Sequence, residues 1–199
     1  MKKDKNFNII LCGVGGQGII TLLQVLAEAA LLEGYDVRAS ELHGLSQRGG
    51  SVVAHLRFGK KVFSPLIMPG ETDLILSLEI TEGLRAASLA GETTTFVINK
   101  KLIPFQDGPT EEELIRKFKK MKERFQLIDA SGICLEKLGK EVLAGTYLLS
   151  VAVLNDLIPL KTESILKAMK NKIAPQYLHS NEQAFALGKP SSPLAKEKA

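Results

Sequence analysis

The stretch Phe7–Gly18, FNIILCGVGGQG, decides the fold of this 199-residue chain. It opens as an apolar, β-branched run typical of a buried strand and closes in glycines, which permit the positive φ of a tight turn. Apolar side chains then recur at helical spacing to about Glu33, and Gly34 follows as a typical C-cap. A second strand-like run occupies 35–41. This part of the chain therefore predicts a right-handed β-α-β unit whose two strands are parallel.

The remaining sequence keeps the alternation of strand-like and helical segments. An alternating run at 51–58, the turn Gly59-Lys60 and a return run at 62–67 predict an antiparallel hairpin. Further strands are expected at 73–78, 94–99 and 126–129, and helices at 82–89, 110–124, 140–154 and 162–172, the last with Thr162 as its N-cap. The predicted class is α/β, a three-layer α/β/α sandwich with a mostly parallel sheet and at least one antiparallel hairpin. Residues 1–188 are expected to form a single domain, and 189–199 a flexible tail.

Composition excludes several classes of protein. With 45% hydrophobic and 24% charged residues, the chain is typical of a globular protein. Its two cysteines, Cys12 and Cys134, are too few for a disulfide framework, a four-thiolate zinc site or an iron–sulfur cluster, so no metal site is expected. The apolar stretch at 8–32 is interrupted by glycines, which disfavours a membrane span. The start, MKKDKNF, runs into a strand without a cleavage site, and the cytoplasm is the expected location.

Much of the net charge of +4 lies on one segment. Its basic residues are Arg116, Lys117, Lys119, Lys120, Lys122 and Arg124, and they interleave with Leu114, Phe118, Met121 and Phe125. This spacing predicts an amphipathic helix with a solvated basic face. No nucleic-acid-binding motif accompanies it, so a nucleic-acid-binding module is the least favoured of three function classes, and no nucleic-acid partner is expected.

The glycine turn is the first candidate site. Gly13, Gly15 and Gly18 match the G-x-G-x-x-G spacing of dinucleotide-binding folds, and Glu41 falls where a ribose-binding acid would lie. The backbone N–H groups at the start of a helix also attract anions. Three interpretations stay open: a Rossmann-like NAD(P)- or FAD-binding oxidoreductase, a turn that faces another phosphate or a partner, and a turn that only lets strand and helix pack closely.

The loop after the second strand is the second candidate site. Glu41, His43, Gln47 and Arg48 lie in it among glycines, and parallel strands would bring it to the same sheet edge as the glycine turn. His43 is a candidate acid or base, although a loop histidine more often only donates hydrogen bonds. Arg48 is a candidate clamp for phosphate or carboxylate, with a structural ion pair as the alternative. Residues 79–82 and 99–101 end two further strands and are expected to join this edge, with Thr81 also suited as a helix N-cap.

Four segments together resemble the γ-type subunit or domain of 2-oxoacid:ferredoxin oxidoreductases, and they span most of the chain. They are GVGGQGI at 13–19, SELHGLSQRGGSVVAHLRFG at 40–59, DLILSLEITEGLRA at 73–86 and NEQAFALG at 181–188. HGLSQRGG is the most specific of these motifs, and it resembles the indolepyruvate, or aryl-pyruvate, branch of the family. The basic segment has no counterpart in the family pattern.

This resemblance implies a multisubunit enzyme that converts a 2-oxoacid and CoA into acyl-CoA and CO2 and reduces ferredoxin. It implies that thiamine diphosphate, magnesium and iron–sulfur clusters belong to a large partner subunit, because this chain has neither the cluster cysteines nor a GDG-type thiamine motif. The chain would bind none of these alone, complete the assembly and be inactive by itself. The family pattern falls on Gly13, Gly15, Gly16, Gln17 and Gly18 and on His43, Gly44, Gln47, Arg48, Gly49 and Gly50 as site-forming residues. The apolar surface around Leu42, Leu45, Ile67 and Met68 is expected to contact the partner.

Overall fold

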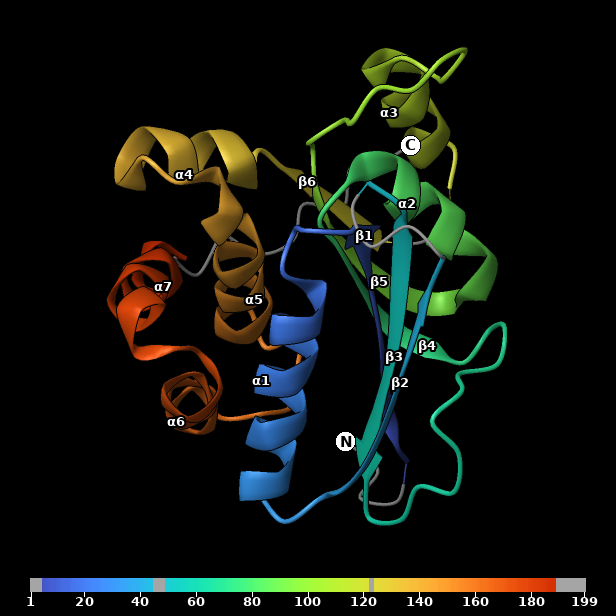
Figure 1. Ribbon diagram of the computed structural model, residues 1–199. Helices are drawn as coiled ribbons and strands as arrows, with labels where there is room; N and C mark the ends of the chain where they lie inside the picture. Colours follow the sequence, from blue (N-terminus) through green and yellow to red (C-terminus); the bar gives the residue numbers. More distant parts are fainter. Residues whose placement is uncertain (1–4, 45–48, 122–123, 189–199) are drawn as a thin grey trace.

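The computed structural model describes residues 5–44, 49–121 and 124–188 (Figure 1). The strands are β1 (Phe7–Val14), β2 (Asp36–His43), β3 (Ser51–Gly59), β4 (Thr72–Ser77), β5 (Ala90–Asn99) and β6 (Arg124–Ile128). The α-helices are α1 (Ile19–Leu32), α2 (Ile80–Ala86), α3 (Glu111–Lys119), α4 (Ala130–Leu138), α5 (Ala144–Leu154), α6 (Thr162–Lys172) and α7 (Pro175–Leu187). Two short 3-10 turns, η1 (Ala87–Leu89) and η2 (Glu141–Leu143), complete the described elements. None of these helices is long and apolar enough to cross a membrane.

All six strands join one mixed sheet in the order β2-β3-β1-β4-β5-β6. The neighbours β1, β4, β5 and β6 are parallel, whereas β3 is antiparallel to both β1 and β2. The sheet is therefore mostly parallel with an antiparallel hairpin, and the predicted α/β class is confirmed. The strands β1 and β2 are parallel as predicted, and β3 is inserted between them.

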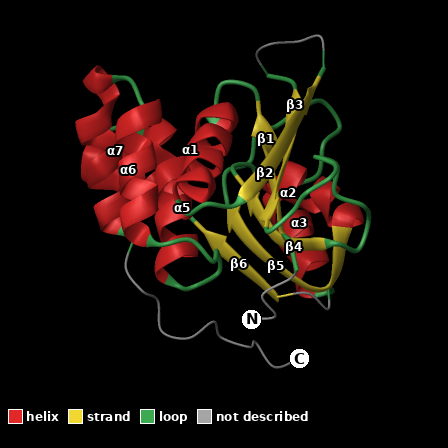
Figure 2. Cartoon of the chain, turned by 90° about the horizontal axis from the view of Figure 1, so that it is seen from below, coloured by secondary structure: helices red, strands yellow, loops and turns green. Residues whose placement is uncertain are grey.

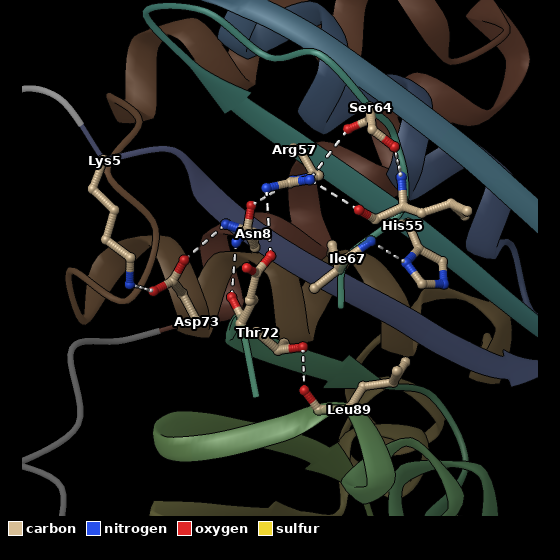
Figure 3. Close-up of polar contacts among 11 residues, drawn as sticks. Lys5, Asn8, His55, Arg57, Ser64, Ile67, Thr72, Asp73 and Leu89 are labelled. Carbon is tan, nitrogen blue, oxygen red and sulfur yellow. Dashed lines mark hydrogen bonds and ion pairs between the residues drawn. The ribbon is translucent and has the colours of Figure 1, made fainter. Parts of the chain in front are cut away.

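The predicted hairpin partner of β3, the segment 62–67, was wrong. Residues 62–67 form no strand, and β3 pairs with β2 instead. Pro65 lies in the middle of that segment and has no N–H to donate to a ladder. Side chains of β3 hold the segment in place: the Arg57 guanidinium donates to the carbonyl oxygen of Leu66 at 2.9 Å, and His55 Nδ1 accepts the N–H of Ile67 at 3.1 Å (Figure 3).

Helices cover the two faces of the sheet unequally (Figure 2). The helices α1, α5, α6 and α7 lie on one face, over the larger apolar core. On the other face, α2 and α3 pack against β1, β4 and β5, where Phe96 and Phe118 are fully buried. The three layers of the predicted sandwich are present, and on this second face Val53 and His55 of β3 lie beside the segment 66–68 and the end of α2.

Several helix boundaries differ from the prediction. The basic helix ends at Lys119, and Arg124 instead begins β6, because this residue pairs with Thr95 of β5. Its predicted start is right, since Thr110 forms a capping box with Glu113. The N-cap of α6 is Lys161 rather than Thr162, and it has no side-chain cap bond. Helices α4 and α7 were not predicted, although Pro175 at the first position of α7 is a typical start signal.

Candidate functional site

The carboxyl ends of β1, β4, β5 and β6 meet at one edge of the sheet. The chain leaves β1 toward the face covered by α1 and leaves β4 toward the face covered by α2. The β1–β4 boundary is therefore a topological switch point, where open α/β sheets bind ligands. Residues 79–82 and 99–101 lie at this edge with the glycine turn, as predicted.

The glycine turn joins β1 to α1 with a backbone that suits only glycine. Gly16 has φ 101° and Gly18, the N-cap of α1, has φ 86°. Gly13 has an ordinary φ, but a Cβ there would lie 2.6 Å from Gln17 Oε1. Gly13 is thus required for close packing, and the other two for the turn itself.

Gln17 fixes the turn from inside. Its Oε1 accepts the N–H of Val14 at 2.8 Å, and its Nε2 donates to the carbonyl oxygen of Leu78 at 3.2 Å. The side chain therefore joins the end of β1 to the residue that follows β4. Both ends of this predicted cofactor-binding residue are engaged with the protein, so its amide supports the site rather than facing outward.

The second candidate loop returns directly to the glycine turn. The Gly15 N–H donates to the carbonyl oxygen of Gly50 at 2.8 Å, and the Gly49 N–H donates to the carbonyl oxygen of Gly15 at 3.4 Å. The structure thus brings the two predicted glycine clusters together. Glu41 lies on β2 with an exposed side chain, and His43 is the last residue of β2. The side chain of His43, and Leu45, Gln47 and Arg48 entirely, lie outside the described residues.

A small cleft of about 240 Å³ opens beside the glycine turn, between the end of β5 and the starts of α4, η2 and α5. Polar side chains in it bind one another. Asn99 Nδ2 donates to Ser131 Oγ at 2.8 Å, and Lys101 Nζ lies 2.8 Å from Glu141 Oε1. The hydrogen bond from Lys101 lowers the pKa of Glu141 below its usual value. The polar side chains of the cleft therefore find most of their hydrogen-bond partners within the chain itself.

Two buried carboxylates lie on the opposite side of the switch point. Glu79 is the N-cap of α2, and it accepts the N–H of Glu82 at 2.8 Å and the N–H of Ile103 at 3.1 Å. Glu82 accepts the hydroxyl of Ser51 at 2.5 Å and pairs with Arg85 at 2.6 Å. The predicted N-cap Thr81 was wrong, because Thr81 lies inside the first turn of α2. Glu82 thus joins α2 to the start of β3, and Glu79 joins it to Ile103, which follows β5.

A larger groove of about 640 Å³ lies on the second face of the sheet, beside the end of α2. Its floor is formed by Val53 and His55 of β3, and its walls by the segment 66–68 and by the end of α2 with η1. His55 is buried, and burial lowers its pKa, so the imidazole is neutral. Because Nδ1 accepts the Ile67 N–H, the proton of this neutral ring is on Nε2 (Figure 3). Sequence reasoning missed His55, whose only signal was its place in an alternating strand.

The cysteines do not fit an iron–sulfur cluster. Cys12 and Cys134 are both buried and belong to different apolar clusters. Burial raises the pKa of Cys12 to about 12 and that of Cys134 to about 11, which disfavours the thiolates that cluster ligation needs. Within the described ranges, no group of three or more His, Cys, Asp or Glu residues could hold a metal ion.

Comparison with known proteins identifies the family. The model of the family "pyruvate ferredoxin/flavodoxin oxidoreductase" matches residues 8–190. The chain belongs to this family. Among its relatives, the indolepyruvate oxidoreductase subunit IorB of Thermococcus kodakarensis is 35% identical over 196 residues, which cover 92% of this chain and 95% of the relative. The pyruvate/ketoisovalerate oxidoreductases common subunit gamma of Thermococcus litoralis is 29% identical over 180 residues, covering 86% of this chain and 89% of the relative.

Solved structures confirm the fold of this oxidoreductase family. The pyruvate oxidoreductase subunit PORC of Thermotoga maritima superposes with a TM-score of 0.70 at 24% identity, covering 93% of this chain and 96% of that one. The 2-oxoglutarate:ferredoxin oxidoreductase of Magnetococcus marinus gives 0.71 at 17% identity over 96% of this chain, which corresponds to 34% of the larger chain. The same architecture thus occurs as a separate subunit and as part of a longer polypeptide.

Family membership confirms the predicted resemblance to a γ-type subunit of an oxoacid:ferredoxin oxidoreductase. The Rossmann-like alternative receives no support from these comparisons. The topology also disfavours it: β3 separates β1 from β2, so Glu41 is two strand spacings, about 10 Å, from β1 instead of one. A ribose-binding acid in a dinucleotide fold lies on the neighbouring strand.

Proposed function

We propose that this chain is the small, cluster-free subunit of a 2-oxoacid:ferredoxin oxidoreductase of the aryl-pyruvate type. The complex would oxidatively decarboxylate a 2-oxoacid such as indolepyruvate, transfer the acyl group to CoA and pass the electrons to ferredoxin in the cytoplasm. The observation that carries this proposal is the 32–35% identity to indolepyruvate oxidoreductase subunits over about nine-tenths of the chain. The common γ subunits of pyruvate/ketoisovalerate oxidoreductases share 29%.

The division of labour follows from what this chain lacks and what it presents. Buried, protonated cysteines cannot carry the electrons. Thiamine diphosphate, its magnesium ion and the iron–sulfur clusters would be held by a large partner subunit, where they supply the decarboxylation and electron transfer. This chain would contribute the glycine turn and the loop that returns to it through Gly49 and Gly50.

The proposed role of that loop is to complete the partner's active site. Glu41, His43 and Arg48 remain the candidate catalytic or clamping residues, and the exposed side chain of Glu41 is consistent with contact to another molecule. Gly13, Gly15, Gly16, Gln17, Gly18 and Gln47 would shape the same site, with Gln17 holding the turn. CoA would be the ligand nearest this loop, since a guanidinium and the N-terminus of a helix suit its phosphates.

Steady-state turnover of the reconstituted complex tests this function. The chain co-expressed with the large subunit of the same organism should reduce ferredoxin with indolepyruvate and CoA, and it should prefer aryl 2-oxoacids to pyruvate and 2-oxoglutarate. Arg48→Ala should raise the KM for CoA, whereas Arg116→Ala on the exposed face of α3 should leave it unchanged. Turnover by the isolated chain, or full turnover by the large subunit without it, would contradict the proposal.

A further inference from the structure

The groove over β3 exposes several large apolar side chains next to one another. Residues Leu42, Leu66 and Met68 line it and are 55%, 48% and 60% exposed. Leu42 pairs with Val53 across the β2–β3 ladder, so the two side chains point to the same face of the sheet. A contiguous exposed apolar surface of this kind is typical of a protein–protein contact.

The polar side chains that line the groove include donors and acceptors. Glu82 accepts a hydrogen bond from the Ser51 hydroxyl and pairs with Nη1 of Arg85, whose side chain is 57% exposed. A guanidinium has five N–H donors, so Arg85 can bind a second acceptor beside Glu82. The neutral ring of His55, which also lines the groove, donates through its Nε2–H. An occupant that fits this arrangement therefore brings apolar side chains together with a carboxylate or another acceptor.

The groove is also continuous with the candidate site. Gly44 and Ser51, which flank the loop proposed to complete the partner's active site, both line it. A chain seated in the groove would hold both ends of that loop. A free small molecule would bury a smaller part of its surface there, because the groove is open and its apolar walls face outward.

We propose that the groove formed by Leu42, Val53, His55, Met68 and Arg85 is the docking site for an apolar segment of the large partner subunit that carries an acidic residue opposite Arg85. This inference rests on the proposed function, since it assumes that such a partner exists. It adds the face on which the partner binds and the chemistry of the segment that binds there. Of the predicted interface residues, Leu42 and Met68 are exposed as this requires, whereas Ile67 is buried.

A pair of charge insertions matched for exposure provides the test. Met68→Glu places a carboxylate in the groove, and Tyr177→Glu places one on α7, on the opposite face, where the tyrosine is 59% exposed. Full-length variants co-expressed with the tagged large subunit should show a Kd at least about ten-fold weaker for Met68→Glu and nearly unchanged for Tyr177→Glu. Unchanged melting temperatures would show that both variants are folded.

A second variant tests the acidic residue. Arg85→Gln should weaken the complex and reduce the dependence of its Kd on salt concentration, because one screened ion pair across the interface is lost. An unchanged Kd in both Met68→Glu and Arg85→Gln would overturn the docking inference. Two other results would also overturn it: self-association of the wild type that Met68→Glu abolishes, and binding of free indolepyruvate that shifts the NMR resonances of His55. If the wild-type complex assembles and turns over in any of these cases, the proposed function stands. If the wild type neither binds the large subunit nor supports turnover, the function itself has failed.

Discussion

The cleft beside the glycine turn and the groove over β3 lie on the same sheet, but they differ in the apolar side chains around their polar groups. In the cleft, Asn99 binds Ser131 and Lys101 binds Glu141, where β5 ends and α4 and η2 begin. In the groove, the pair of Glu82 and Arg85 lies among exposed apolar side chains, those of Leu42, Leu66 and Met68. The cleft thus resembles an intramolecular contact between elements of this chain, whereas the groove resembles one side of a protein–protein interface. Substitutions in the cleft should therefore affect folding, and those in the groove should affect assembly.

The strongest contrast is expected from one leucine in each region. Leu78 lines the cleft and is buried in the larger core, so Leu78→Ala should lower the free energy of unfolding by about 2–5 kcal/mol. Leu66 lines the groove at 48% exposure, and Leu66→Ala should cost less than about 1 kcal/mol in the isolated chain. Urea denaturation of both variants measures the difference. Equal losses would show that the groove is part of the folding core.

Removal of the internal clamp of the turn should have the next largest effect. Gln17→Ala leaves the N–H of Val14 and the carbonyl oxygen of Leu78 without their side-chain partner, at a cost of about 1–3 kcal/mol. Gln24→Ala on the exposed side of α1 is the matched control and should stay within about 0.5 kcal/mol of the wild type. A stability of Gln17→Ala equal to that of the control would instead assign the amide to ligand binding.

The pH dependence of stability should report the groove through His55. Burial lowers the pKa of His55 in the folded state, so the unfolded state binds more protons and stability is lost as the pH falls below the unfolded pKa of about 6.5. His55→Asn should lose less stability than the wild type between about pH 7.5 and about pH 5.5, because this titration is removed. His179→Asn, at an exposed site on α7, should keep the wild-type dependence. Identical pH profiles for all three proteins would exclude His55 as the titrating group.

The fold class was predictable because its strongest signals are local. The β-branched run before the glycines, the Schellman-type end of α1 at Gly34 and the capping box at Thr110 each depend on residues close in sequence. The insertion of β3 between β1 and β2 was not predictable, because strand order depends on which edges pair. For the same reason, the segment 62–67 was assigned to a strand although Pro65 disfavours one.

The candidate site was predictable only in part. The proximity of the glycine turn to Gly49 and Gly50 followed from the parallel direction of β1 and β2, and the backbone bonds confirm it. The inward use of Gln17 was not predictable, since its partners Val14 and Leu78 meet only after β1 and β4 pair. The apolar surface around Leu42 and Met68 was predicted as a partner contact, but the groove that it lines was not predicted, because Val53 and His55 reach it from β3 and Arg85 from α2 only after the chain has folded.

The smallest effect is expected from the ion pair at the mouth of the cleft. Lys101 and Glu141 are both partly exposed, so Lys101→Gln should cost only about 0.2–1 kcal/mol at neutral pH. The hydrogen bond from Lys101 lowers the pKa of Glu141, so its stabilisation is present above the unfolded pKa of about 4.3 and is lost as the pH falls below it. NMR titration of Lys101→Gln should therefore show a higher pKa for Glu141, while Lys117→Gln on α3 leaves it unchanged. If the pKa of Glu141 does not move, the pair does not close the cleft, and Lys101 would be available to an anionic group of a ligand.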